Sequence, residues 1–362
     1  METLKEIVNR FDITGEVTDV KPLGNGLIKD NYKVITSGDA PDYVLQRINN
    51  AIFKDVELLQ HNIEAVTNHI RRKMVSKGEG DIDRKVLRYV KVKDTDATYC
   101  CVDGKYWRVS LFIDNAFTYE AVTPEYSYCA GKAFGNFEAM LADIPEKLGE
   151  TIPDFHNMEL RLRQLEEAVA EDKAGRLSLP ESKSILEFIR EHQEEMCKAE
   201  RLHKEGKLPK RICHCDTKVN NMMFDDKGNV LCVIDLDTVM PSFVFSDFGD
   251  FLRTGANTVA EDDPAIDKVS FRMDIFESFA KGYLESTASF LTPVEKENLP
   301  YGVLLFPFMQ AVRFFTDYLN GDTYYRIKYP EHNLVRTRNQ IALFKSALKN
   351  YDSMISFRGK GI

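Results

Sequence analysis

The segment at residues 211–239 constrains the fold of this chain more than any other, because it places polar residues at fixed spacings around a short β pattern. Asp216 and Asn221 are five residues apart, and Asp235 follows Asp216 by 19 residues. All three side chains carry oxygen atoms that can accept protons or bind metal ions. A fold that brings them together would create a site with acid–base and metal-binding chemistry.

The stretch between Asn221 and Asp235 predicts a β-hairpin. Residues 222–224 and 230–234 have the character of strands, and the residues around Gly228 are typical of a turn. Pairing the strands about Gly228 places Asn221 opposite Asp235, and cross-strand neighbours have Cβ atoms about 5 Å apart. The hairpin therefore predicts an amide and a carboxylate side by side at its open end.

An amide oxygen and a carboxylate at that separation are suitable ligands for Mg²⁺, which prefers hard oxygen donors. Asp216, just upstream, is placed to accept a proton from an attacking hydroxyl group. Positioning and charge neutralisation are the main requirements of phosphoryl transfer. The alternative is that these are ordinary loop and strand-end residues, but three polar groups at one hairpin mouth favour the chemical interpretation.

The first 113 residues predict a small antiparallel sheet with one long helix. Strand-like runs alternate with turn-rich segments, and a helical pattern of apolar residues follows the third run. The predicted strands are Val17–Leu23, Tyr32–Thr36, Tyr43–Asn49, Thr98–Val102 and Trp107–Ile113, and the predicted helix is Val56–Val75.

In the remaining residues the pattern changes to long helices around the single β segment. The predicted helices include Tyr126–Leu141, Met158–Ala170, Ser182–Lys204, Val269–Tyr283 and Pro293–Leu319. We therefore predict an α+β fold with a small antiparallel-sheet N-lobe at 1–113 and a large, mainly helical C-lobe at 114–362. This arrangement resembles the bilobal fold of protein kinases.

Composition and charge exclude several classes of function. The net charge of −9 argues against a nucleic-acid-binding surface. No apolar run reaches the ~18 residues that a membrane span needs, and Met1–Glu6 lacks the basic and apolar regions of an export signal. Seven irregularly spaced cysteines indicate reduced thiols, and Cys213-His214-Cys215 lacks the spacing of a zinc site. We expect a cytoplasmic protein without nucleic-acid or membrane partners.

The β segment resembles the catalytic segment of the aminoglycoside phosphotransferase/choline kinase family, in which His-x-Asp-x-x-x-x-Asn is followed by an Ile-Asp segment. His214, Asp216, Asn221 and Asp235 match this signature residue by residue. The resemblance implies an ATP- and Mg²⁺-dependent kinase with Asp216 as the catalytic base. It also implies Asn221 and Asp235 as the Mg²⁺ ligands and His214 as a structural brace of the catalytic loop.

Further segments, spread over about residues 17–342, are similar to those of the N-acetylhexosamine 1-kinases, which phosphorylate the anomeric hydroxyl of GlcNAc or GalNAc. The most distinctive of them is Lys328–Arg338. The resemblance implies a sugar substrate, with Asn220 and Arg313 among the residues that bind it. An anomeric hydroxyl is more acidic than an ordinary alcohol, so an aspartate is an adequate base for it.

The nucleotide-binding residues that the resemblance implies depart from the usual pattern. Gly24-Asn25-Gly26 lies between the first two strands, where a phosphate-covering loop would lie. Gln46 stands where a strand lysine usually contacts the nucleotide phosphates, so Mg²⁺ and backbone amides would carry more of that task. Asp114 marks the place where we expect the adenine, and Leu27 replaces a histidine present in some hexosamine kinases.

Asp247-Phe248-Gly249 spells the metal-binding motif of protein kinases, but it lies 31 residues beyond Asp216 and does not directly follow the hairpin. We expect Asp247 and Asp250 to cap or anchor the next helix, with a substrate contact as the alternative.

Other acceptors and a second class of function remain open at this point. The acceptor could be another alcohol, such as choline, homoserine, an aminoglycoside or methylthioribose. The missing strand lysine also permits a catalytically inactive nucleotide-binding module. We expect a small-molecule sugar as the partner and a monomer or a weak homodimer.

Overall fold

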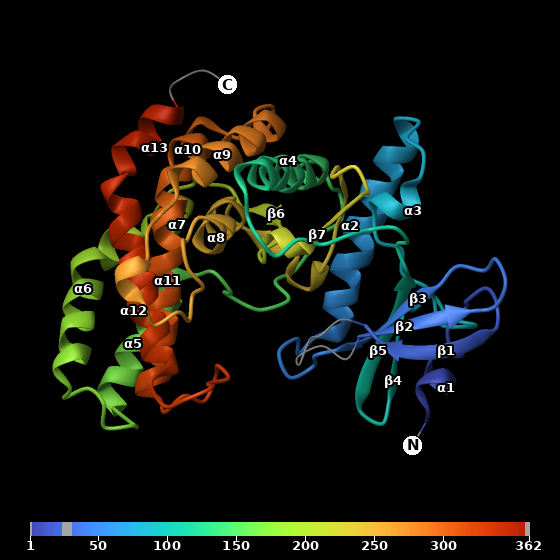
Figure 1. The fold of residues 1–362 in the computed structure, drawn as a ribbon, viewed down its shortest axis with the longest axis horizontal. Coiled ribbons are helices and arrows are strands. Elements are labelled where there is room, and N and C mark those ends of the chain that lie inside the picture. Colours follow the sequence, from blue (N-terminus) through green and yellow to red (C-terminus); the bar gives the residue numbers. More distant parts are fainter. Residues whose placement is uncertain (1, 24–30, 359–362) are drawn as a thin grey trace. The chain divides into compact units, whose positions relative to one another are not determined.

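The computed structural model describes residues 2–23 and 31–358, which fall into two compact units (Figure 1). The first unit contains Met1–Thr118, Asp143–Pro153 and Met222–Met240. The second contains Tyr119–Ala142, Asp154–Asn221 and Pro241–Ile362. The boundary predicted after residue 113 stays a prediction.

The first unit is built on a five-stranded sheet in which every pair of neighbouring strands is antiparallel, in the order β1-β2-β3-β5-β4. The predicted sheet is therefore confirmed, with ends that differ by one or two residues. The unit also carries the β7–β8 hairpin. Its elements are α1 (Leu4–Val8), β1 (Val17–Pro22), β2 (Asn31–Thr36), β3 (Tyr43–Ile48), α2 (Val56–Ser76), α3 (Ile82–Lys85), β4 (Tyr99–Val102), β5 (Lys105–Leu111), β7 (Met222–Phe224), β8 (Val230–Val233) and η2 (Leu236–Thr238).

The two faces of this sheet differ because side chains alternate along each strand. Leu45 on β3 and Val109 on β5 are register partners, and both are fully buried in a core that also contains Phe11. The neighbouring pair on the opposite face, Gln46 and Arg108, is polar. One face therefore contributes to the core of the unit, and the other carries polar side chains that can form hydrogen bonds.

The second unit is mainly helical, and the α+β class predicted from the sequence is confirmed (Figure 1). Most helices were predicted. However, Ser182–Lys204 is interrupted at Cys197 and Pro293–Leu319 at Asn298, where the backbone leaves helical geometry. The elements are α4 (Pro124–Leu141), α5 (Met158–Glu171), α6 (Pro180–Met196), α7 (Lys198–Lys204), β6 (Arg211–Cys213), η1 (Val219–Asn221), β9 (Met240–Ser242), α8 (Phe245–Gly255), η3 (Ile266–Lys268), α9 (Met273–Thr287), α10 (Pro293–Glu297), α11 (Leu299–Leu319), α12 (His332–Lys349) and α13 (Tyr351–Arg358).

Helices α4 and α9 pack along each other, and glycines let their backbones come close. A Cβ atom on Gly131 of α4 would lie 2.1 Å from the Phe279 carbonyl oxygen, and one on Gly282 of α9 would lie 2.2 Å from the Tyr128 carbonyl oxygen. Such distances are far inside van der Waals contact, so only glycine fits at these positions. No helix in the described part of the chain is both long and apolar enough to cross a membrane.

The close approach of α4 and α9 predicts a large effect of one added methyl group. Gly282→Ala should lower the free energy of unfolding by about 1–3 kcal/mol, because the helices must separate to admit the Cβ atom. Gly80→Ala is the control, since a Cβ atom there would meet nothing within 4 Å. Urea denaturation of both variants measures the difference, and equal stabilities would contradict this account of the helix pair.

Candidate active site

The loop that carries Asp216 is held by a buried carboxylate in the first turn of α8. The two oxygens of Asp247 accept hydrogen bonds from the backbone N–H groups of His214, at 2.8 Å, and Cys215, at 2.7 Å. The Thr217 hydroxyl donates to the Asp247 carbonyl oxygen at 2.8 Å. Asp247 is fully buried, so its carboxylate needs these donors to offset the loss of water. Asp247 therefore holds the loop from within α8, whereas the sequence led us to expect it to cap or anchor that helix.

His214 lies beneath the loop and contacts no solvent. Its Nδ1 accepts a hydrogen bond from the Asp216 backbone N–H at 3.3 Å, and its ring meets the edges of Phe134 and Phe137. The side chain thus packs the loop against α4. These contacts fit a bracing role, and they leave the ring away from solvent.

Asp216 is partly exposed and has a cation on one side and an amide on the other. Lys218 Nζ lies 2.5 Å from Asp216 Oδ1. Asn221 Nδ2 donates to the Asp216 carbonyl oxygen at 2.7 Å and to its Oδ2 at 3.2 Å. Burial would lower the pKa of Lys218, but the carboxylates of Asp216 and Asp250 outweigh it and raise that pKa. The lysine is therefore held charged next to Asp216.

The orientation of Asn221 suits it to bind a cation. Its Nδ2 is committed to Asp216, so the Oδ1 oxygen is the atom that remains to coordinate a hard metal ion. Asn221 is 7% exposed, whereas its neighbour Asn220, the predicted substrate ligand, is exposed.

The β7–β8 hairpin exists, but its predicted register is wrong by one residue. Met222 pairs with Val233, whereas a turn centred on Gly228 would pair it with Ile234. The cause is the turn itself: Asp225 N–H donates to the Asn229 carbonyl oxygen at 2.9 Å, which closes a loop of residues 226–228. A register shift follows between Met223 and Phe224.

Asp235 follows the hairpin in the left-handed conformation, with φ 61°, and η2 begins immediately after it. An aspartate tolerates this conformation better than most residues. This left-handed residue ends the extended backbone of β8, so Asp235 does not continue the alternation of side chains along the strand. Asn221 belongs to the second unit and Asp235 to the first, and their joint role as Mg²⁺ ligands stays a prediction.

A second buried carboxyl group lies behind Asp247. Glu138 on α4, Cys213 and Asp247 each place one ligand atom within 4.8 Å of the others. Glu138 Oε2 accepts a hydrogen bond from the Tyr283 hydroxyl at 2.5 Å, and its Oε1 is buried without a partner. Burial and the Asp247 charge raise the pKa of Glu138 well above its usual value. This shift favours a proton on Glu138, because two carboxyl groups buried this close together are costly when both are charged.

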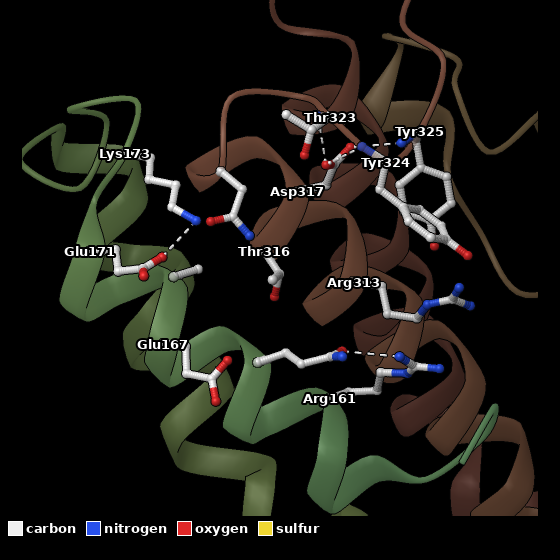
Figure 2. Close-up of a pocket in the computed structure, with 13 residues that line it drawn as sticks. Arg161, Glu167, Glu171, Lys173, Arg313, Thr316, Asp317, Thr323, Tyr324 and Tyr325 are labelled. Atoms are coloured by element: carbon white, nitrogen blue, oxygen red, sulfur yellow. Dashed lines mark hydrogen bonds and ion pairs between the residues drawn. The ribbon is translucent and has the colours of Figure 1, made fainter. Parts of the chain in front are cut away.

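A pocket of about 440 Å³ opens in the second unit between α5, α11 and the segment after α11 (Figure 2). Arg161 and Arg313 place their guanidinium groups on the side where Tyr324 and Tyr325 lie. Arg313 lies 5.9 Å from the centre of the Tyr324 ring and 5.6 Å from that of Tyr325. Asp317 orders this side, because its carboxylate accepts the backbone N–H groups of residues 323–325 at 2.8–2.9 Å.

Arg161 and Arg313 lie near each other without a carboxylate partner among the described residues. Burial and the neighbouring Arg313 lower the pKa of Arg161 to about 10. Arg161 Nε is buried without a hydrogen-bond partner, and within the described residues neither guanidinium forms an ion pair with a carboxylate. Burial and the charges of Arg313 and Arg161 also lower the pKa of His156 well below its usual value, and Asp216 opposes this. The pocket arginines and Asp216 therefore act on the same buried imidazole.

The predicted nucleotide residues are described only in part. Gly24-Asn25-Gly26 and Leu27 lie outside the described residues. Gln46 Oε1 accepts hydrogen bonds from Arg108 on β5. Asp114 is exposed, and its carbonyl oxygen accepts a hydrogen bond from Arg84 Nη2 at 3.0 Å. Their roles in nucleotide binding stay predictions.

The sequence analysis missed four residues with a place in these arrangements: Arg108, Glu138, Arg161 and Lys218. Lys218 had a usable signal, because it follows the predicted base by two residues. Arg161 had none, since it lies on a helix far along the chain from Arg313, and only the packing of α5 on α11 brings the two together.

Comparisons with known proteins identify the family of this chain and agree with its fold. A family model described as the phosphotransferase enzyme family matches residues 19–283. Because this is well over half of the chain, the chain belongs to the phosphotransferase enzyme family, and it is an ATP-dependent small-molecule kinase.

Solved structures with the same fold have low sequence identity to this chain. An aminoglycoside phosphotransferase from Alicyclobacillus acidocaldarius is 13% identical, with a TM-score of 0.62 over 99% of this chain and 97% of that one. A spectinomycin phosphotransferase solved with ADP and spectinomycin is 11% identical, with a TM-score of 0.55 over 97% of each chain. A choline/ethanolamine kinase family protein from Mesorhizobium loti is 16% identical, with a TM-score of 0.55 over 97% of this chain and 94% of that one.

The proton that we assign to Glu138 predicts a pH effect on stability. A carboxyl group whose pKa is raised by folding stabilises the protein fully below its ordinary pKa, here 4.5, and this contribution is lost as the pH rises toward the raised value. Glu138→Gln keeps a donor for Asp247 and has no proton to lose. Its unfolding free energy should therefore fall less than that of the wild type between about pH 5 and pH 8.

The measurement is urea denaturation across this pH range, with Glu125→Gln, an exposed position of the same helix, as the control. Glu138→Ala should cost about 1–3 kcal/mol, because it leaves the buried Tyr283 hydroxyl without a partner. Identical pH profiles for the wild type and Glu138→Gln would show that Glu138 does not carry the proton.

Proposed function

We propose that this protein transfers the γ-phosphoryl group of ATP to the anomeric hydroxyl of an N-acetylhexosamine, GlcNAc or GalNAc, by direct in-line displacement. The observation that carries the proposal is the loop at residues 214–221, which holds a partly exposed carboxylate, a charged lysine and an amide oxygen in one short segment. Phosphoryl transfer needs this combination of base, cation and metal ligand.

In the proposed reaction Asp216 orients the acceptor hydroxyl and accepts its proton as the bond to phosphorus forms. A positioned general base of this kind contributes roughly 10²–10⁴-fold to a rate. Lys218 keeps its charge next to Asp216 and would offset negative charge on the transferred group. No covalent enzyme intermediate is needed, because the hydroxyl attacks phosphorus directly.

Mg²⁺ would be held by the Oδ1 oxygen of Asn221 and the carboxylate of Asp235. The fit of Asn221 rests on its own hydrogen bonds, which use the nitrogen of the amide and leave the oxygen. When bound, the ion would neutralise charge on the nucleotide phosphates. Gln46, Asp114 and the segment Gly24-Asn25-Gly26 remain our candidates for contacts with the nucleotide.

The pocket of Figure 2 is the proposed acceptor site. Guanidinium donors and tyrosine faces suit a ring with many hydroxyl groups, because donors bind the oxygens and aromatic rings cover apolar faces. Two neighbouring arginines without carboxylate partners among the described residues oppose cationic acceptors such as choline or an aminoglycoside. Arg313 and Asn220 remain candidates for sugar contacts, and Arg161 joins them.

The same arginine pair favours one alternative acceptor, homoserine. Its carboxylate could accept hydrogen bonds from both guanidinium groups, since arginine binds carboxylates with two parallel bonds. This acceptor would use a primary alcohol in place of an anomeric hydroxyl. Homoserine is therefore the second candidate.

The role of Asp216 predicts a loss of turnover without loss of nucleotide binding. Asp216→Ala should lower kcat by roughly 10²–10⁴-fold, because the general base is removed. Binding of ATP, measured by calorimetry, should change little, since the substituted group faces the acceptor. Full activity of Asp216→Ala with GlcNAc or GalNAc would eliminate this assignment.

The proposed acceptor pocket predicts which substrates are phosphorylated and which arginines contribute to binding of the sugar. Phosphorus NMR of the products should show a phosphate on the anomeric carbon of GlcNAc or GalNAc. Arg161→Ala and Arg313→Met should each raise the KM for the sugar about tenfold or more, because a buried hydrogen bond to the substrate is lost. Arg163→Ala, an exposed position on the same helix as Arg161, is the control. Turnover of homoserine or choline with none of either hexosamine would replace the sugar proposal.

A further inference from the structure

The polar face of the first unit's sheet is organised by one buried arginine. Gln46 on β3 and Arg108 on β5 are register partners, so their side chains leave the same face of the sheet. Arg108 is 2% exposed. A buried guanidinium must be paired and hydrogen-bonded, because its desolvation is otherwise very costly. The partners of Arg108 therefore reveal what this face is built to hold.

Arg108 is satisfied from three directions. Its Nη2 group forms an ion pair with the Asp237 carboxylate, which neutralises its charge. Its Nη1 group donates to Gln60 Oε1 on α2 at 3.0 Å. Its Nε and Nη2 groups both donate to Gln46 Oε1, at 2.9 Å and 2.6 Å. Four of the five N–H donors of Arg108 are therefore engaged within the protein, and its side chain is almost completely buried.

The double bond to Gln46 fixes which way its amide faces. A guanidinium group has only donors, so the group of Gln46 that faces Arg108 has to be the carbonyl oxygen. The Nε2 group, with its two N–H donors, must then face away from Arg108. Without the arginine, the amide of a glutamine could present either end. Arg108 thus turns an ambiguous side chain into a directed donor.

On its other side, Arg108 begins a chain of hydrogen bonds that ends on a carboxylate. Gln60 Nε2 donates to the Thr98 hydroxyl oxygen at 2.8 Å, and that hydroxyl donates to Glu64. The Gln60 amide and the Thr98 hydroxyl thus link the arginine to the glutamate, and every donor in the chain points toward the glutamate. The polarity of this chain fixes the orientation of Gln60, just as the double bond fixes that of Gln46.

We propose that Arg108 is a positioning residue that holds the Gln46 amide as a hydrogen-bond donor to the phosphate oxygens of the bound nucleotide. The proposal rests on the nucleotide-contact role proposed for Gln46 and goes beyond it by naming the residue that sets the direction of the amide. The charge of Arg108 is neutralised by Asp237, and the Gln46 N–H groups make the phosphate contact. This strand therefore recognises phosphate through a neutral donor that a buried cation keeps in place.

The test is calorimetric titration of the full-length protein with ATP, without any acceptor. Gln46→Glu keeps the bonds from Arg108, since a carboxylate accepts them equally well, but it replaces the outward donor with a negative oxygen. Loss of a hydrogen bond to a charged group should raise the Kd for ATP roughly 10-fold to 100-fold. Asn49→Asp is the matched control: the same chemical change is made three residues along, where the oxygen accepts the Ala51 N–H at 3.2 Å and would still do so.

A second pair of variants separates positioning from simple structural support. Arg108→Lys keeps the charge beside Asp237 but cannot supply the three remaining donors, so it should raise the Kd for ATP several-fold. In a Gln46→Ala background this increase should disappear, because the side chain that Arg108 orients is gone. Lys105→Gln, an exposed charge change on the same strand, should leave ATP binding as in the wild type.

The outcomes are distinct. Unchanged ATP affinity in Gln46→Glu, with the wild type binding ATP, overturns the inference and leaves the kinase proposal standing. An equal effect of Arg108→Lys in both backgrounds shows that Arg108 only supports the fold, and also overturns it. A wild-type protein that binds no ATP overturns the proposed function together with this inference.

Discussion

The candidate active site depends on the buried carboxylate of Asp247 and the two backbone N–H groups that it accepts. A carboxylate without water is stable only when donors surround it, and here those donors come from the loop that carries Asp216. The same bonds therefore satisfy the charge and fix the loop. Lys218 and Asn221 follow on this short segment, so their geometry is set by the same anchor. Glu138 lies next to Asp247, and its raised pKa favours a neutral carboxyl group at that position.

The first unit applies the same principle with the opposite charge. Arg108 is buried on the sheet, and the groups that satisfy it are Asp237, Gln46 and Gln60. Each of these side chains is held in one orientation because a guanidinium accepts no hydrogen bonds. The segment after β8 is thereby tied to the strand that carries Gln46. In both units a buried charge does more than contribute to stability: it decides the direction of the polar groups around it.

The acceptor pocket differs from these two arrangements, because its arginines donate to neutral oxygens, such as those of Gln164 and Gln310, instead of to carboxylates. Arg161 and Arg313 are brought together by α5 and α11 and have no carboxylate partner among the described residues. Burial, together with the repulsion from Arg313, lowers the pKa of Arg161. A ligand with several oxygen acceptors would relieve both the repulsion and the missing hydrogen bond at Arg161 Nε. This is the physical basis for proposing a sugar, or a carboxylate-bearing alcohol, in place of a cationic acceptor.

The sheet, most helices and the loop of Asp216 and Asn221 could be predicted from the sequence, because they depend on local periodicity and on spacing along the chain. The predicted hairpin register was wrong by one residue, because the Asp225–Asn229 bond closes a turn centred one residue before Gly228. The charged neighbours of Asp247, Arg108 and Arg161 follow from tertiary packing. They are Glu138, Asp237 and Arg313, which lie 109, 129 and 152 residues away along the chain, and only packing brings such distant charges together. The partners of the buried charged side chains therefore depend on the fold, whereas the loop of Asp216 and Asn221 can be recognised in the sequence.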